Sequence, residues 1–304
     1  MSAIFSNAFP DWTIVRSDQS LAAVATVGRR IEIWTDKGGT LTLARSDDHD
    51  SYRLSFDHQV AVDLILSDRR LVETELAADV PKSTRDHFLA DQVLPRMVAH
   101  YGHLVLHAGA VVLARGTKAG AVAILGDSGA GKSTLVASFK QAGDQLLGDD
   151  AMIVDFDERR PSIRPVYRSL RLFPDSIDRF FPSAATLDVA HYTSKQRIRL
   201  DLPSQVVPAS PPLDALFVLG APSDDGAIKV ERLSMANACM ALIENSFMLD
   251  PTDLERAQTR MRKASRLVGD VPAFALSFPR DYDVLPEVRS AMLSAVEQLH
   301  FVRE

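Results

Sequence analysis

Hydrophobic and polar positions alternate along the first quarter of the chain. Residues 31–35 alternate strictly, and a turn signal at 37–39 separates them from the next apolar run. Two further runs, at 52–56 and 60–66, continue the pattern. Alternation of this kind is typical of half-buried strands. Residues 1–78 are therefore predicted to form a β-rich N-terminal domain, in which we identify no residues with obvious chemistry.

A helical period replaces the alternation after residue 80. Six apolar side chains fall on one face of a helix predicted over 81–100, namely Phe88, Leu89, Val93, Leu94, Met97 and Val98. Two apolar runs follow, at 104–113 and 121–125, and the turn residues between them predict a hairpin. A helix over 133–142 and a strand over 145–154 come next.

The last half of the chain mixes an irregular stretch with regular patterns. Residues 157–212 are rich in proline and basic residues and are predicted to be irregular. After them we expect strands at 213–219 and 273–278, and helices at about 234–247, 252–268 and 286–299. The alternation of strands and helices predicts an α/β domain over residues 79–304.

The most specific motif lies between the strand at 121–125 and the helix that follows it. It fits the P-loop pattern of a glycine, four residues and Gly-Lys-Ser, and consists of Gly126, Asp127, Ser128, Gly129, Ala130, Gly131, Lys132, Ser133 and Thr134. Its glycines let backbone N–H groups point inward, and the helix N-terminus adds partial positive charge. Lys132 can reach the β- and γ-phosphates of ATP, and the Ser133 hydroxyl can bind Mg²⁺. The motif predicts a nucleotide phosphate site.

Two adjacent acids interrupt the predicted strand at 145–154. Asp149 and Asp150 lie 16 and 17 residues past Ser133, so this strand can return beside the P-loop strand and bring them near the phosphates. One carboxylate could bind Mg²⁺ while the other takes a proton from an attacking hydroxyl. A turn or a helix cap, where Asp is common, is the alternative.

Other polar residues are weaker candidates. His107 lies in the apolar run at 104–113, where a lone histidine is commonly a core residue, and only its strand position favours the phosphate pocket. Basic residues of the irregular stretch are second-tier candidates for phosphate or substrate contacts, with surface charge as the alternative: Arg168, Arg171, Lys195 and Arg197.

Composition narrows the classes of partner. The net charge of −6 argues against nucleic acid as a general partner. The single cysteine, Cys239, cannot form an internal disulfide, which agrees with a reducing compartment. We see no signal-peptide pattern at residues 1–6 and no apolar run of membrane-spanning length. A soluble, cytoplasmic protein is expected, and a homo-oligomer stays open.

Taken together, these residues resemble the catalytic domain of HPr kinase/phosphorylase and its relatives, and most of all the kinase-like proteins found with lasso-peptide biosynthesis. The matching segments are residues 106–108, the P-loop, 147–150, 171–176, the stretch around Lys195 at 193–197, and 278–283. The resemblance runs from about Phe88 to the C-terminus. It implies a P-loop kinase fold of the HPr kinase/PEP carboxykinase-like type behind the β-rich domain.

The resemblance also implies an activity, which is ATP-dependent phosphorylation of a serine hydroxyl in a peptide or protein. The acid matching Asp149 is the general base, the lysine matching Lys132 binds the β-phosphate, and the serine matching Ser133 helps to hold Mg²⁺. Asp150 is assigned to Mg²⁺ as well. A histidine matching His107 lies near the phosphate pocket. The bifunctional enzymes carry a glutamate-bearing metal loop that this sequence lacks, which argues against HPr as substrate and against the reverse reaction.

Two other functions stay open. The acceptor could be a small-molecule hydroxyl, which a deep pocket beside Asp149 would favour. A nucleotide-gated binding protein without turnover is the non-enzymatic alternative, and the paired acids argue against it because a sensor needs no base.

Overall fold

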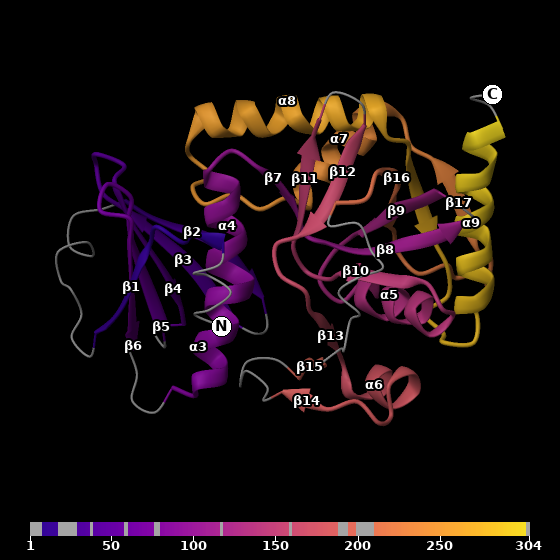
Figure 1. The fold of residues 1–304 in the computed structure, drawn as a ribbon, viewed down its shortest axis with the longest axis horizontal. Helices are drawn as coiled ribbons and strands as arrows, with labels where there is room; N and C mark the ends of the chain where they lie inside the picture. Colours follow the sequence, from indigo (N-terminus) through magenta and orange to yellow (C-terminus); the bar gives the residue numbers. More distant parts are fainter. Residues whose placement is uncertain are drawn as a thin grey trace. The chain divides into compact units, whose positions relative to one another are not determined.

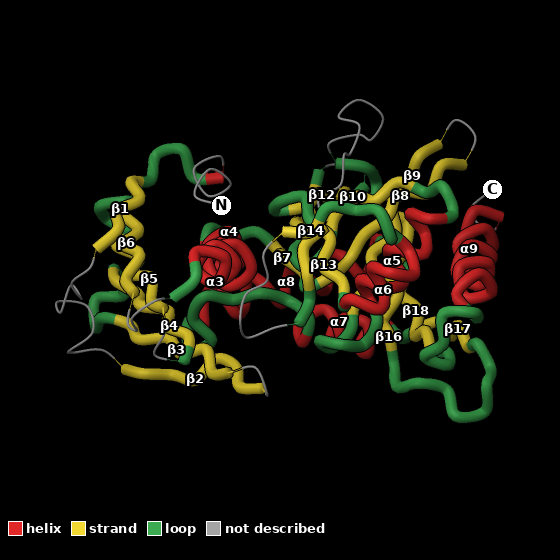
Figure 2. Tube along the Cα trace, turned by 90° about the horizontal axis from the view of Figure 1, so that it is seen from below, coloured by secondary structure: helices red, strands yellow, loops and turns green. Residues whose placement is uncertain are grey.

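The computed structural model describes residues 8–17, 29–36, 39–57, 60–75, 80–115, 118–157, 160–187, 194–198 and 210–301. The chain is a mixed α/β protein with several sheets (Figures 1 and 2). It divides into two compact units. Unit 1 comprises Met1–Met97, Asp188–Lys195 and Leu249–Thr252, and unit 2 comprises Val98–Leu187, Gln196–Met248 and Asp253–Glu304.

Unit 1 contains one six-stranded sheet of order β1-β6-β5-β4-β3-β2. Neighbouring strands from β2 to β6 are antiparallel, and β1 is parallel to β6. The strands are β1 (Thr13–Ser17), β2 (Arg29–Asp36), β3 (Gly39–Arg45), β4 (Ser51–Phe56), β5 (Val60–Ile65) and β6 (Arg70–Glu75). Four of them, β2 to β5, match the runs predicted as strands at 31–35, 41–43, 52–56 and 60–66.

Unit 1 also extends beyond the predicted boundary at residue 78. Its next elements are helix α3 (Lys82–Phe88) and a π-helical turn η1 (Leu89–Val93), which continues into α4 (Leu94–His100). Unit 1 ends at Met97, within α4. Phe88 packs on Phe56 of β4 with ring centroids 6.5 Å apart. The predicted single helix widens at this point, where the Leu94 N–H donates to Leu89 O, five residues back.

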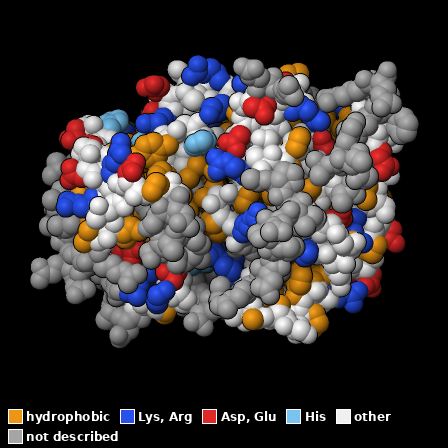
Figure 3. All heavy atoms as spheres, in the orientation of Figure 1, with side chains coloured by type: hydrophobic (Ala, Val, Ile, Leu, Met, Phe, Trp, Pro, Cys, Tyr) orange, Lys and Arg blue, Asp and Glu red, His pale blue; other side chains and the backbone are white. Residues whose placement is uncertain are grey.

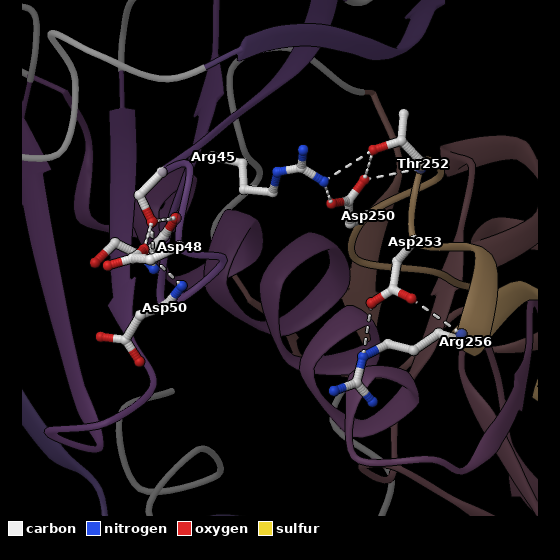
Figure 4. A network of polar contacts seen from close by, with 9 residues as sticks. Arg45, Asp48, Asp50, Asp250, Thr252, Asp253 and Arg256 are labelled. Atoms are coloured by element: carbon white, nitrogen blue, oxygen red, sulfur yellow. Dashed lines mark hydrogen bonds and ion pairs between the residues drawn. The ribbon is translucent and has the colours of Figure 1, made fainter.

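A buried ion pair also belongs to unit 1. Figure 4 shows Arg45, at the end of β3, reaching Asp250 and Thr252 from the other end of the sequence. The Arg45 Nη1–Asp250 Oδ2 distance is 2.6 Å, and the Asp250 side chain is fully buried. A segment far along the chain is therefore part of the first unit.

Unit 2 is built around a six-stranded mixed sheet of order β10-β8-β9-β16-β18-β17, in which β9, β16 and β18 are parallel. Its strands are β8 (Ala108–Arg115), β9 (Lys118–Leu125), β10 (Gln145–Gly148), β16 (Leu213–Leu219), β17 (Lys229–Arg232) and β18 (Ala273–Ser277). The predicted hairpin corresponds to β8 and β9, which pair from Ala108↔Leu125 to Arg115↔Lys118.

Alternating side chains of the P-loop strand β9 divide between two cores. Val122 and Ile124 pack with α5 (Lys132–Gln141), α6 (Pro174–Phe180) and α9 (Leu285–Phe301). Ala121, Ala123 and Leu125 pack on the other face with α7 (Met235–Glu244) and α8 (Leu254–Asp270). Figure 1 shows α7 and α8 on the opposite side of the sheet from α5. Unit 2 therefore has three layers, with the sheet in the middle.

The stretch predicted as irregular, 157–212, contains regular elements, and for these residues the prediction was wrong. They are β12 (Pro161–Pro165), β13 (Leu170–Leu172), α6, β14 (Thr186–Leu187) and β15 (Gln196–Ile198). Proline begins and ends β12, an edge strand, where a missing N–H is tolerated. Short strands stabilised by pairing with other segments leave little local pattern.

Candidate functional site

The loop between β9 and α5 adopts backbone conformations that only glycine takes readily. Gly126, Gly129 and Gly131 have φ values of 142°, 82° and 99°. Gly126 is also held closely, since a Cβ there would lie 3.0 Å from Leu219 Cβ. A Cβ on Gly129 would meet nothing within 4 Å. The loop thus has a packed beginning and an open tip.

Lys132 folds back onto the beginning of this loop. Its Nζ donates to Gly126 O at 2.6 Å and to Asp127 O at 2.9 Å, and its side chain is buried. Ser133 is buried and Thr134 half-buried in the first turn of α5. Asp127, Ser128 and Gly129 are exposed at the tip, and Ala130 is half-buried. The nine predicted nucleotide-binding residues therefore form one loop and one helix N-terminus, a geometry suited to anions.

Strand pairing brings His107 and Asp149 to the same edge of the sheet as this loop. Because Ala108 pairs with Leu125, His107 and Gly126 both lie just beyond that pair. Because Gly148 pairs with Ala110, Asp149 continues opposite Gly109. A Cβ on Gly109 would lie 3.1 Å from Asp149 Oδ1, so the carboxylate reaches the next strand.

The strands that carry these residues are each bent at this point, where single strands were predicted over 104–113 and 145–154. β7 (Leu104–Leu106) and β11 (Met152–Phe156) pair in a separate three-stranded sheet, with Leu106 opposite Met152. In the large sheet, Ala110 pairs with Gly148. Three residues on each strand, 107–109 and 149–151, separate this pair from the Leu106–Met152 pair. Asp150, with φ of 72°, is in the left-handed conformation that such a turn requires. We call residues 107–109 and 149–151 the corner.

β10 does not lie beside the P-loop strand, contrary to the prediction from spacing. It pairs with β8, which separates it from β9. The reason is that the β8–β9 hairpin already occupies that edge of β9. The acids still reach the loop's edge of the sheet, because the corner begins where β10 ends.

The two acids have different surroundings. Asp149 is fully buried, and Asp149 Oδ2 accepts a long hydrogen bond of 3.4 Å from the Arg171 N–H. Asp150 is buried in a bidentate ion pair, in which Arg171 Nε lies 2.6 Å from Oδ2 and Nη2 lies 3.0 Å from Oδ1. Both Asp150 oxygens therefore already accept hydrogen bonds from a guanidinium.

The four basic candidates do not form one cluster. Arg171 lies on β13 beside the acids, opposite Arg197 on β15, whose guanidinium lies 5.4 Å from the Tyr167 ring centroid. Arg168 is exposed. Lys195 is half-buried and groups with unit 1, so it is described separately from this site.

Sequence patterns missed Asn245, which follows the end of α7. Its side-chain Oδ1 accepts from the Gly126 N–H at 3.1 Å, and its backbone O accepts from the His107 N–H at 2.7 Å. Its Nδ2 donates to Ala241 O at 2.9 Å. One asparagine thus joins the start of the loop to the corner. An Asn after a helix is an ordinary cap, so no local pattern distinguishes it.

A second set of contacts ties the P-loop helix to the chain after β18. Thr134 Oγ1 lies 3.3 Å from Ser176 Oγ, which lies 2.9 Å from the Tyr282 hydroxyl. Tyr282 donates to Asp175 Oδ2 at 2.7 Å. Burial, together with the Asp175 carboxylate, raises the pKa of Tyr282, which keeps its hydroxyl protonated as a donor.

The residues of the loop, the α5 N-terminus and the corner fit a phosphate group better than they fit a metal ion. Among the described ranges, no three His, Cys, Asp or Glu side chains gather in a way that could hold a metal. A P-loop magnesium site needs few protein ligands, since phosphate oxygens and water complete it. Ser133 suits that role, whereas Asp150 would have to exchange Arg171 for the ion.

The surface and the helices add two observations. Acidic and basic side chains are interspersed over the described part of the face drawn in Figure 3. No helix in the part of the chain that the structure describes is both long enough and apolar enough to cross a membrane.

No protein-family model matches the chain, and no curated protein matches it. Among solved structures, it is similar to an HPr(Ser) kinase/phosphatase from Coxiella burnetii, with 12% sequence identity over 66% of this chain and 97% of that chain. The TM-score is 0.31, which is too low for this likeness to support a shared fold or function.

Proposed function

We propose that the chain is an ATP-dependent kinase that transfers the γ-phosphate of ATP to a serine hydroxyl of a peptide or protein. The observation that best supports this is the strand register at the corner. It brings a buried carboxylate, Asp149, to the sheet edge at which the glycine-rich loop and the α5 N-terminus have a geometry suited to anions. A base beside a phosphate site is what transfer to a hydroxyl requires.

The proposed roles follow from these positions. The loop amides and Lys132 bind the phosphates and stabilise charge on the transferring group. Asp149 takes the proton of the acceptor hydroxyl while the hydroxyl oxygen forms a bond to the γ-phosphorus. The bond between the γ-phosphorus and the β–γ bridging oxygen breaks, and ADP leaves. His107 contacts the transferring group from the corner. Arg168, Arg197 and Lys195 remain substrate candidates.

Magnesium would be held by Ser133, with Asp150 as the second predicted ligand. When bound, Mg²⁺ neutralises charge on the β- and γ-phosphate oxygens. The ion pair with Arg171 supports a different contribution from Asp150, which is to fix the backbone segment that donates to Asp149.

The proposal also concerns the molecule that accepts the phosphate. The resemblance to the kinases of lasso-peptide biosynthesis names a serine-bearing precursor peptide as the first acceptor to test. Panels of serine peptides and of small hydroxyl compounds, each with γ-labelled ATP, distinguish a peptide kinase from a small-molecule kinase.

The full burial of Asp149 favours a second candidate. A carboxylate with 0% exposure cannot meet an acceptor hydroxyl unless the corner opens, and it would suit a structural acid in a nucleotide-gated binding protein. Such a protein would bind ATP without turnover. Measurement of ATP binding and phosphate transfer in the same preparations separates the two candidates.

The deciding experiment replaces Asp149 with Asn, which keeps shape and removes the base. We expect Asp149→Asn to lower phosphate transfer about a hundredfold or more, with ATP affinity changed little. The matched control is Asp155→Asn, because Asp155 lies on β11 beyond the corner and pairs with Arg164. Transfer by Asp149→Asn at the wild-type rate would exclude Asp149 as the base. ATP binding without transfer to any acceptor, in wild type as well, would favour the binding protein.

A further inference from the structure

The segment that follows β18 shares the sheet edge of the nucleotide loop. β16 is parallel to both β9 and β18, and Val218 pairs with Leu125 while Leu219 pairs with Leu276. The three strands therefore end at the same edge. In open α/β sheets this carboxyl edge is where ligands bind.

Arg280 places its guanidinium against the loop from this segment. Its Nη1 lies 3.9 Å from the position that a Cβ of Gly131 would occupy, which is ordinary van der Waals distance. Its Nη2 donates to Gly220 O at 2.9 Å, just after β16. The guanidinium carbon lies 4.6 Å from the Phe278 ring centroid. The hydrogen bond to Gly220 O and the packing on Phe278 hold the cation next to Gly131, the residue that precedes Lys132.

The chemistry of this arrangement suits a phosphate chain. A guanidinium has five N–H donors in a planar fork, so one bond to Gly220 O uses only part of its capacity. Arg280 is exposed, which leaves it accessible from solvent. Lys132 Nζ, the other cation at the loop, is engaged with the carbonyls of Gly126 and Asp127. A second fixed cation adds to the field at the α5 N-terminus.

We propose that Arg280 binds the phosphate groups of the nucleotide at the P-loop, an inference that rests on the proposed function. It assigns to the site a cation from the opposite end of the domain sequence. The alternative is that Arg280 only fixes the loop after β16 through Gly220 O.

The test measures binding and folding in the same variants. We expect Arg280→Ala to weaken binding of MgATP and of inorganic tripolyphosphate about ten- to a hundredfold. The melting temperature without ligand should stay close to that of wild type, while the rise produced by ligand shrinks. Arg280→Lys, which keeps the charge without the fork, should lie between the two. If Arg280→Ala folds poorly, Arg280→Lys is used to test the proposal.

The matched control is Arg179→Ala, because Arg179 contacts the same segment through Asp283 at 2.8 Å and is exposed. If Arg280→Ala binds MgATP and tripolyphosphate as tightly as Arg179→Ala does, the inference is overturned. If Arg280→Ala lowers only the melting temperature, Arg280 stabilises the fold and does not bind the nucleotide. Arg280-dependent binding without phosphate transfer would support the inference and refute the kinase. No binding by wild type would overturn both.

Discussion

At the scale of single residues, Asn245 is the contact on which the start of the nucleotide loop depends most clearly. Asn245→Ala removes the acceptor of the buried Gly126 N–H, and an unsatisfied buried donor costs about 1–3 kcal/mol. We expect that loss in the free energy of unfolding, measured by urea denaturation followed at 222 nm. Asn237→Ala, an exposed position on the same helix, is the control. Equal urea midpoints for the two variants would show that this hydrogen bond contributes nothing.

The same residues show what a sequence can and cannot predict at this scale. Glycines, Lys132 and Ser133 are recognisable because their spacing along the chain is itself the structure of the loop. Asn245 acts across 119 residues, and nothing local marks it. The environment of Asp150 could not be predicted either, because its partner Arg171 lies 21 residues away. Arg171 is placed by β13 of the three-stranded sheet of β13, β15 and β14.

At the scale of elements, the packing of α5 on β8 depends on the absence of a side chain at Gly109. A Cβ there would lie 2.6 Å from Val136 Cγ2 and 3.1 Å from Asp149 Oδ1. Val136 is buried and β-branched, so its χ1 angle is stiff. We expect Gly109→Ala to cost about 1–3 kcal/mol and to displace Asp149, which lowers phosphate transfer more than ATP binding.

Gly269→Ala is the matched change, because a Cβ there meets nothing within 4 Å and the residue lies in the last turn of α8. It should be neutral or stabilise the protein by up to about 1 kcal/mol. A Gly109→Ala variant that is as stable and as active as Gly269→Ala would refute this account of the corner.

Element type was predictable wherever a pattern ran long enough, as for α7, α8, α9 and the β8–β9 hairpin. The bends were not. His107 and the pair Asp149–Asp150 interrupt otherwise apolar runs, and these interruptions were interpreted as polar residues within straight strands. They mark the corner at which two paired strands leave one sheet for another. Periodicity reports which face a residue takes, and it is silent on which sheet the next residue joins.

At the scale of the whole molecule, the compact units do not follow the order of the sequence. A boundary at residue 78 is the natural choice from composition, yet α3 packs through Phe88 on the sheet of unit 1. Residues 249–252 join the same unit from the far end of the chain. Local patterns cannot foresee such a discontinuous unit, because contacts within it, such as Arg45 with Asp250, span 205 residues.

That contact predicts a pH dependence for unit 1. Burial by itself raises the pKa of Asp250, but hydrogen bonds from Thr252 and the Arg45 guanidinium outweigh it and hold the pKa below its ordinary value. This stabilisation is present above the ordinary pKa of an aspartate and is lost as the pH falls through the lowered pKa of Asp250, because the unfolded chain binds the proton first. Asp250→Asn should remove this part of the pH dependence and lower stability at neutral pH.

Fluorescence reports unit 1 selectively, since both tryptophans, Trp12 and Trp34, belong to it. Asp68→Asn, at an exposed site, is the control, and identical acid unfolding curves for both variants would refute the assignment.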